Sequence, residues 1–271
     1  MKFININSEE LLQLGQQRHA DYVHADPFPS GYFDHFFNEE MLNMVLDEFP
    51  DLSKKPVLQY NDPNQVKLAS DKEDNFGDVT KQFMHFMNSA PFLNFLSALT
   101  GIKNLIPDPY YLGGGHHQIM PGGFLKLHAD FNKHPDNKLD RRLNVLVYLN
   151  KDWEDSYGGH FQLWDKDMKE CRAKILPLFN RMAMFSTTSH SYHGHPDSLT
   201  CPADRSRRSL ALYYYSNGRP EEEINEAPGE HTTLFKYRKG EDDTTRRKNS
   251  IRKAVELFVP PIFLHAINKL K

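Results

Sequence analysis

Between residues 107 and 218, short runs of β-branched and aromatic residues are separated by Gly, Pro, Asn and Asp. No helical pattern intervenes between these runs, and such spacing is typical of an antiparallel sandwich or barrel. Helical patterns precede this region, which predicts an α+β class with helices packed on an all-β core. The expected strands are residues 118–119, 124–130, 143–150, 160–164, 181–186 and 209–215.

Helix-start and helix-stop signals divide the first third of the chain. Apolar residues recur at helical spacing after each start signal, which favours amphipathic helices. Glycine just after the last apolar position is a common helix end. The expected helices are one capped by Asn7 and Ser8, one capped by Asn38, and two at residues 79–87 and 91–100, the last ended by Gly101.

Three further segments complete the expected organisation. The polar residues 56–78 should form a loop, and residues 232–237 a short strand within a charged connection. Residues 250–271 are amphipathic and are expected to pack on the body. We therefore divide one structural domain into an N-terminal helical support region, a catalytic core and a C-terminal extension, at residues 1–106, 107–218 and 219–271.

Composition excludes several classes of protein. The formal net charge is -3 with both signs interspersed, which argues against a nucleic-acid-binding protein. The two cysteines, Cys171 and Cys201, exclude a disulfide framework and a four-thiolate zinc site, and free thiols are expected. We find no signal peptide and no apolar run near the roughly 20 residues that span a bilayer. The expected location is cytoplasmic.

A His-x-Asp pair on a strand can supply two ligands to one metal ion, because residues two apart point to the same side. Short motifs of this kind arise easily by chance, so their context must choose among them. Only the pair at residues 128 and 130 ends a strand-like run, FLKLHAD. His128 and Asp130 are therefore the candidate ligands. The full set is His19–Asp21, His24–Asp26, His128–Asp130, His134–Asp136 and His195–Asp197.

The third ligand should be a histidine on a later strand, since iron(II) oxygenases typically use two imidazoles and one carboxylate. Three histidines follow the strand-like run RMAMFS. His193 is ranked first, because Gly194 removes side-chain bulk beside the metal. His195 is the second choice and His190 the third.

An arginine in the last core strand can anchor a carboxylate, because its planar fork makes two charge-assisted hydrogen bonds. In RRSLALYYYS, Arg207, Ser209 and Ala211 share one face by the period of two. Arg207 and Ser209 would offer a guanidinium and a hydroxyl on the side of the strand that faces a binding cavity. The small side chain of Ala211 would leave room there for the ligand. Arg208 points to the opposite face and is the alternative anchor.

Tyr148 shares a strand face with Asn144 in LNVLVYLN. Its phenol could donate to the same carboxylate, which would place both residues at a cofactor site. A core tyrosine with a satisfied hydroxyl is the competing interpretation.

At these residues the chain resembles the prolyl-4-hydroxylase-like branch of the iron(II)/2-oxoglutarate oxygenases, over about residues 107–216. One departure is Leu125, three residues before His128, where many members have tyrosine. The resembling motifs are HAD at residues 128–130, YLNKDW at 148–153, the glycine pair 158–159, His193, and Arg207 at the head of an R-x-S strand.

The resemblance implies a double-stranded β-helix (jelly-roll, cupin-like) core and a dioxygenase that uses Fe(II), 2-oxoglutarate and O2, with ascorbate as a reductant. It implies that His128, Asp130 and His193 bind iron, while Arg207 and Tyr148 hold the far carboxylate of 2-oxoglutarate. The expected reaction is hydroxylation of an unidentified substrate, a protein side chain or a small metabolite, with succinate as coproduct.

A second class of function competes with this one. A jelly-roll module without turnover could sense a ligand or bind a partner protein. The same three ligands would also accept zinc. An arginine–serine anchor has no purpose in a zinc hydrolase, which favours the oxygenase.

Overall fold

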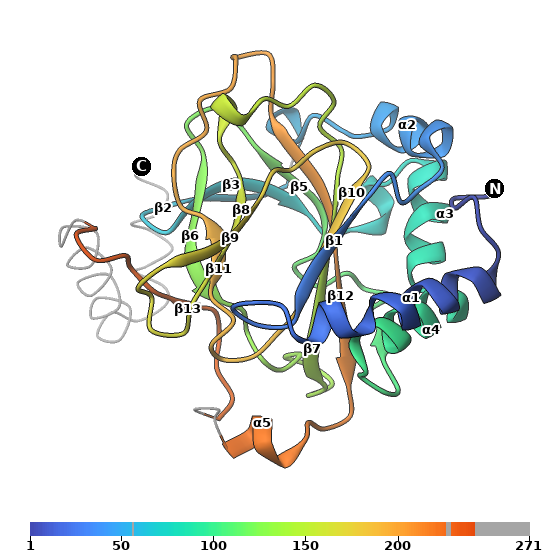
Figure 1. The fold of residues 1–271 in the computed structure, drawn as a ribbon. Helices are drawn as coiled ribbons and strands as arrows, with labels where there is room; N and C mark the ends of the chain where they lie inside the picture. Colours follow the sequence, from blue (N-terminus) through green and yellow to red (C-terminus); the bar gives the residue numbers. More distant parts are fainter. Residues whose placement is uncertain (56, 226–228, 242–271) are drawn as a thin grey trace.

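The computed structural model describes residues 1–55, 57–225 and 229–241. Its β region is one 13-stranded antiparallel sheet that curls until its two halves face each other (Figure 1). Along the sheet the strand order is β1-β10-β7-β12-β5-β3-β6-β11-β8-β9, and β2, β4 and β13 pair at its sides. This is the expected α+β, double-stranded β-helix architecture. The strands are β1 (Ser30–Asp34), β2 (Leu58–Asp62), β3 (Gln65–Ser70), β4 (Ile106–Pro107), β5 (Gly115–Ile119), β6 (Phe124–Ala129), β7 (Asp140–Tyr148), β8 (Phe161–Trp164), β9 (Cys171–Ile175), β10 (Arg181–Ser186), β11 (His193–His195), β12 (Arg207–Ser216) and β13 (Leu234–Phe235).

The helices cover the outer face of one half of the sheet (Figure 1). Asn7 caps α1 through a capping box with Glu10, and the Asn38 side chain caps α2. Gly101, at φ 75°, ends α4 in the left-handed region where glycine is favoured. These predicted caps are confirmed. The helices are α1 (Ser8–Val23), α2 (Glu39–Asp47), α3 (Asp78–Met87), α4 (Ala90–Thr100) and α5 (Glu221–Asn225).

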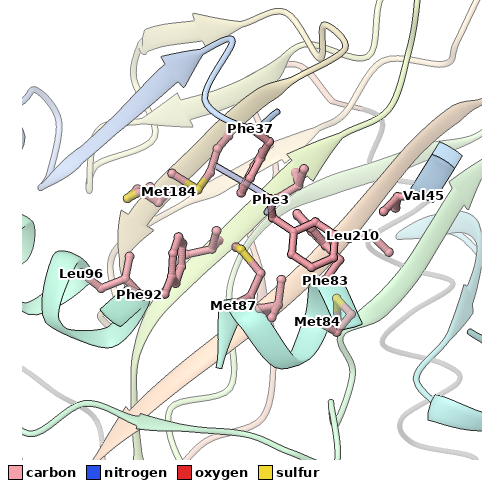
Figure 2. Close-up of a cluster of buried hydrophobic side chains, with 14 of the residues drawn as sticks. Phe3, Phe37, Val45, Phe83, Met84, Met87, Phe92, Leu96, Met184 and Leu210 are labelled. Carbon is pink, nitrogen blue, oxygen red and sulfur yellow. The ribbon is translucent and has the colours of Figure 1, made fainter. Parts of the chain in front are cut away.

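The two faces of strand β7 pack against different parts of the molecule. Leu143, Val145 and Val147 belong to the large core shared with the helices. The alternate residue Tyr148 packs against the facing half of the sheet. Figure 2 shows part of the large core, where side chains of the helices meet those of β10 and β12. The strand therefore has one face in the core shared with the helices and the other face between the two halves of the sheet.

The predicted loop at residues 56–78 is wrong, because this segment contains the hairpin β2–β3. Strand β3 pairs with both β5 and β6, so it joins the two halves of the sheet. Strand β3 contains several polar residues, and β2 is an edge strand. Neither strand therefore shows the alternation of apolar and polar residues by which strands are recognised in a sequence. Strands β1, β9 and β11 were also missed, and β1 pairs with β10.

After α5 the chain returns to the sheet. Strand β13 lies within the predicted strand at residues 232–237 and pairs with β6. The expected packing of residues 250–271 lies outside the described residues. Cys171 and Cys201 are free thiols, as predicted. No helix in the described ranges has the length and apolar character that a membrane crossing requires.

A carboxylate from one helix end caps the start of another. Glu48 follows α2 and accepts hydrogen bonds of 3.0 Å from the Val79 backbone and 2.8 Å from the Thr80 backbone. The Thr80 hydroxyl donates a third bond of 2.8 Å. Burial raises the pKa of Glu48, but these hydrogen bonds outweigh it and lower the pKa below its usual value. The charged form is thus the one that stabilises α3.

We expect Glu48→Ala to lower the free energy of unfolding at pH 7 by about 1–2 kcal/mol, the usual cost of losing a helix cap. A carboxylate with a lowered pKa stabilises the fold above its unfolded pKa of about 4.3, and the effect is lost as the pH falls through the folded value. The difference from wild type should therefore shrink below about pH 4. Urea unfolding at pH 7 and below about pH 4 measures this difference in the free energy of unfolding, with Glu170→Ala, at an exposed position, as the control. An equal loss at both pH values would contradict this account.

Candidate metal centre

Two antiparallel strands bring the candidate ligands together. His193 on β11 lies directly opposite His128 on β6, and Asp130 follows the end of β6. One ligand atom from each residue lies within 4.8 Å of the others. The Asp130 carboxylate is 3.5 Å from Nε2 of each histidine. All three side chains are buried, as a metal site inside a cavity requires.

Backbone carbonyls orient both imidazoles. Nδ1 of His128 lies 2.8 Å from the Lys126 carbonyl, and Nδ1 of His193 lies 2.9 Å from the Ser191 carbonyl. A carbonyl only accepts, so each Nδ1 must carry a proton, and in the neutral imidazole this leaves the lone pair on Nε2. Burial, with His128 adding to it, lowers the pKa of His193 to about 3. The neutral imidazole is the form that binds a metal ion.

Asp130 is held by two residues of β7. Its Oδ2 accepts hydrogen bonds from Arg141 at 2.9 Å and from the Asn144 amide at 3.1 Å. Arg141 is itself buried, with its guanidinium 3.5 Å from the ring centroid of Tyr213. Burial alone would raise the pKa of Asp130, but Arg141 and the neighbouring histidines lower it well below its usual range. Asp130 is therefore ionised.

Arg141 was not predicted. The only signal was an arginine at the entrance to an apolar strand, which is more often a solvated end residue. Asn144, which we expected at the cofactor, donates to Asp130, and its buried Oδ1 has no hydrogen-bond partner among the residues that the structure describes. Such partners hold a metal-binding carboxylate in place.

The alternative histidines lie outside the cluster. His195 is also on β11, and neither of its buried ring nitrogens makes a hydrogen bond within the described part of the chain. It lies opposite Leu125 rather than opposite the other ligands. His190 is a loop residue. Within the described ranges, no further group of three or more His, Cys, Asp or Glu side chains is close enough to hold a metal ion.

Arg207 and Arg208 occupy opposite faces of β12, as predicted. Arg207 is buried, and it donates to the Gly159 carbonyl at 2.8 Å and to the Tyr148 hydroxyl at 3.3 Å. Arg208 instead contacts Ser206 and lies over the Phe49 ring, on the helix side. The guanidinium buried on the inner face of the sheet is therefore that of Arg207.

Two small residues, Ser209 and Gly159, lie beside Arg207. Ser209 is buried and lies opposite Tyr148 on β7 and opposite His117 on β5. Gly159 has φ 71°, and a Cβ there would lie 2.9 Å from Cδ of Arg207. This position therefore needs glycine for both its backbone angle and the close approach of the arginine.

Strand β7 connects the two parts of the candidate site. Asn144 contacts Asp130, and Tyr148 contacts Arg207, from the same inward face of the strand. At about 3.3 Å per residue, four residues along a strand separate these positions by roughly 13 Å. The ligand cluster and a buried guanidinium therefore lie on the same inner face of the sheet.

The donor set fits a divalent metal ion. Two imidazole lone pairs and an ionised carboxylate converge at one point, where they would repel one another unless a cation lies between them. Two histidines and one carboxylate are also the ligand set that non-haem iron(II) oxygenases use, with coordination positions left open. Iron(II) and the residues present are therefore compatible.

Solved structures of prolyl 4-hydroxylases share this fold. The enzyme from Pseudomonas putida matches with a TM-score of 0.53 and 16% identity, over 75% of this chain and 100% of its own. A prolyl hydroxylase from Trichoplax adhaerens, in complex with a hypoxia-inducible factor peptide, has a TM-score of 0.54 and 16% identity over 81% and 95%. The enzyme from Phytophthora capsici gives 0.51 and 16% over 92% and 75%.

No curated protein matches the chain closely enough to count as a relative. The sequence profile of the 2OG-Fe(II) oxygenase superfamily matches residues 115–252, half of the chain. The matched region contains the ligand cluster and Arg207. The chain thus belongs to the 2OG-Fe(II) oxygenase superfamily, a class of 2-oxoglutarate-dependent oxygenases that use Fe(II), 2-oxoglutarate and O2.

Proposed function

We propose that this oxygenase is a hydroxylase that binds iron through His128, Asp130 and His193. The observation that carries the proposal is the arrangement along β7, where contacts from one face of the strand connect the ligand cluster to Arg207. A metal site alone would also suit zinc and hydrolysis. A buried guanidinium beside it suits a second, carboxylate-bearing molecule such as 2-oxoglutarate.

Iron(II) with 2-oxoglutarate supplies the activation of O2, coupled to oxidative decarboxylation of the cosubstrate to succinate and CO2. The chain's own residues would position the partners of this chemistry. With its Nε and Nη2 already engaged by Gly159 and Tyr148, Arg207 makes no hydrogen bond through Nη1 in the part of the chain that the structure describes. That donor would meet the far carboxylate of 2-oxoglutarate. Tyr148 accepts from Arg207, so its own proton is free to donate to the same carboxylate.

The metal ligands favour hydroxylation over halogenation. A halogenase leaves a coordination position open for chloride, whereas here Asp130 would fill it.

Aromatic side chains also exclude water from the imidazoles: the ring centroid of Phe185 is 4.3 Å from that of His193, and the ring centroid of Phe235 is 5.5 Å from that of His128. A dry site protects a reactive centre from side reactions.

We expect the wild-type protein to release succinate slowly from 2-oxoglutarate without its prime substrate, and only when Fe(II) and O2 are both present. Ascorbate should prolong this turnover. Succinate is measured by liquid chromatography and mass spectrometry, with His128→Ala as the inactive control. No succinate from the wild type, or as much from the variant, would refute the proposal. Anaerobic Fe(II) with 2-oxoglutarate should also give a metal-to-ligand charge-transfer band, which zinc cannot give.

A further inference from the structure

A lysine from the N-terminal third lies on the same inner face of the sheet as Arg207. On β3, Leu68 lies opposite Gln118 of β5, so Lys67 lies one position on, beside Ile119. Ile119 in turn lies opposite Arg207 on β12. Residues opposite each other in antiparallel strands share a face. Lys67 and Arg207 therefore lie in one row across the inner face of the sheet, two strands or about 10 Å apart.

Lys67 has no counter-ion in the described part of the chain. It makes no hydrogen bond or ion pair there, and its Nζ lies 5.0 Å from the ring centroid of Tyr60 on β2. Burial lowers the pKa of Lys67 to about 8, and the attraction of Asp130 only partly opposes this. Lys67 is partly buried, and a lysine withdrawn from water in this way usually has a counter-ion. An unpaired lysine on the face of the sheet that carries Arg207 indicates an anionic ligand.

The cosubstrate does not account for this anion. Fe(II) with 2-oxoglutarate, and Asp130 with Arg141, each form a neutral pair, so Arg207 and Lys67 together leave two positive charges in the site. Under the proposed function, one carboxylate of 2-oxoglutarate belongs to the metal and the other to Arg207. The positive charge of Lys67 therefore remains uncompensated when metal and cosubstrate are both bound.

We infer that Lys67 binds a carboxylate of the prime substrate, so that the molecule to be oxidised is an organic acid. This inference rests on the proposed function. Lys67 lies in residues 1–106, outside the segment that carries the metal ligands and Arg207. A residue outside that segment can contribute to the selection of the prime substrate without binding the metal or 2-oxoglutarate. A carboxylate fits better than a phosphate, because phosphates usually gather several donors or a helix N-terminus. Lys67 offers one ammonium group.

The smallest probes of this site are acetate and its neutral analogue acetamide. We expect acetate to bind saturably to the anaerobic Fe(II)–2-oxoglutarate protein, in calorimetry and as a shift of the charge-transfer band, and acetamide not to bind. Lys67→Met should weaken acetate binding at least about tenfold, because a charge-assisted contact is lost. Lys67→Arg should restore much of it. The affinity for 2-oxoglutarate should stay within about twofold, since Lys67 does not hold that molecule.

The control variant is Lys174→Met, which removes an exposed lysine on β9. Circular dichroism checks that Lys67→Met is folded. The inference is overturned if acetate fails to bind the wild type, if it binds Lys67→Met equally well, or if 2-oxoglutarate affinity falls tenfold, which would assign Lys67 to the cosubstrate. Failure of the proposed function looks different: no charge-transfer band and no succinate in any variant.

Discussion

His193→Ala is expected to lower the affinity for Fe(II) by roughly 100-fold or more, and to reduce succinate release to the level without metal. Loss of a supporting contact to a metal ligand already costs about 10- to 100-fold, and this change removes the ligand itself. The remaining residues, His128 and Asp130, would supply only two of the three protein ligands. Anaerobic titration of Fe(II) measures the affinity, and 2-oxoglutarate turnover gives the second readout.

The matched control for this variant is His190→Ala. His190 lies three residues earlier, outside the ligand cluster, so its loss should change Fe(II) affinity by less than about twofold. His195→Ala is a harder test, because His195 is buried on the same strand. It should retain Fe(II) binding. Equal losses from His193→Ala and His195→Ala would mean that the cluster does not define the metal site.

The sequence predicted those parts of the fold in which local chemistry and tertiary role agree. Asn7 and Asn38 cap their helices because a side-chain oxygen meets free backbone donors whatever the surroundings. Strand β12 was recognisable because its length and apolar content suit a strand packed on both faces. The opposite directions of Arg207 and Arg208 follow from the strand period alone.

The hairpin β2–β3 and strand β11 were missed for a shared reason. Strands β3 and β11 have polar side chains on the inner face of the sheet, and β2 is an edge strand, so none of them shows the apolar alternation by which strands are recognised. Strand β11 contributes two histidines and a glycine to the sheet, and β3 contributes Lys67. Residues 56–78 were therefore assigned to a loop although they contain the strand that joins the two halves of the sheet.

The partners of Asp130 could not be read from one sequence. The distance between Asp130 and Arg141 depends on how the connection from β6 to β7 folds back, and no periodicity encodes that turn. A buried arginine is also rare enough that a solvated one is the better expectation without a structure. Here the ion pair and the stacking on Tyr213 explain its burial.

The second large effect is expected for Arg207→Met, which should weaken 2-oxoglutarate binding by roughly 30- to 1000-fold, about 2–4 kcal/mol. Methionine keeps much of the apolar stem but removes the guanidinium, so the far carboxylate of 2-oxoglutarate would be buried without a cation. Fe(II) affinity should change little, because Arg207 contacts none of the three candidate ligands. The intensity of the charge-transfer band against 2-oxoglutarate concentration measures the effect.

Arg208→Met separates this role from a general effect of removing an arginine from β12. Arg208 contacts Ser206 and the Phe49 ring on the helix side, so its loss should leave the 2-oxoglutarate affinity within about twofold. Because Arg207 also donates to Tyr148, Tyr148→Phe should cost less than Arg207→Met, as it removes one hydroxyl and no charge. A larger loss from Arg208→Met than from Arg207→Met would place the cosubstrate on the other face of the sheet, away from the His128, Asp130 and His193 cluster, and the proposed site would then be wrong.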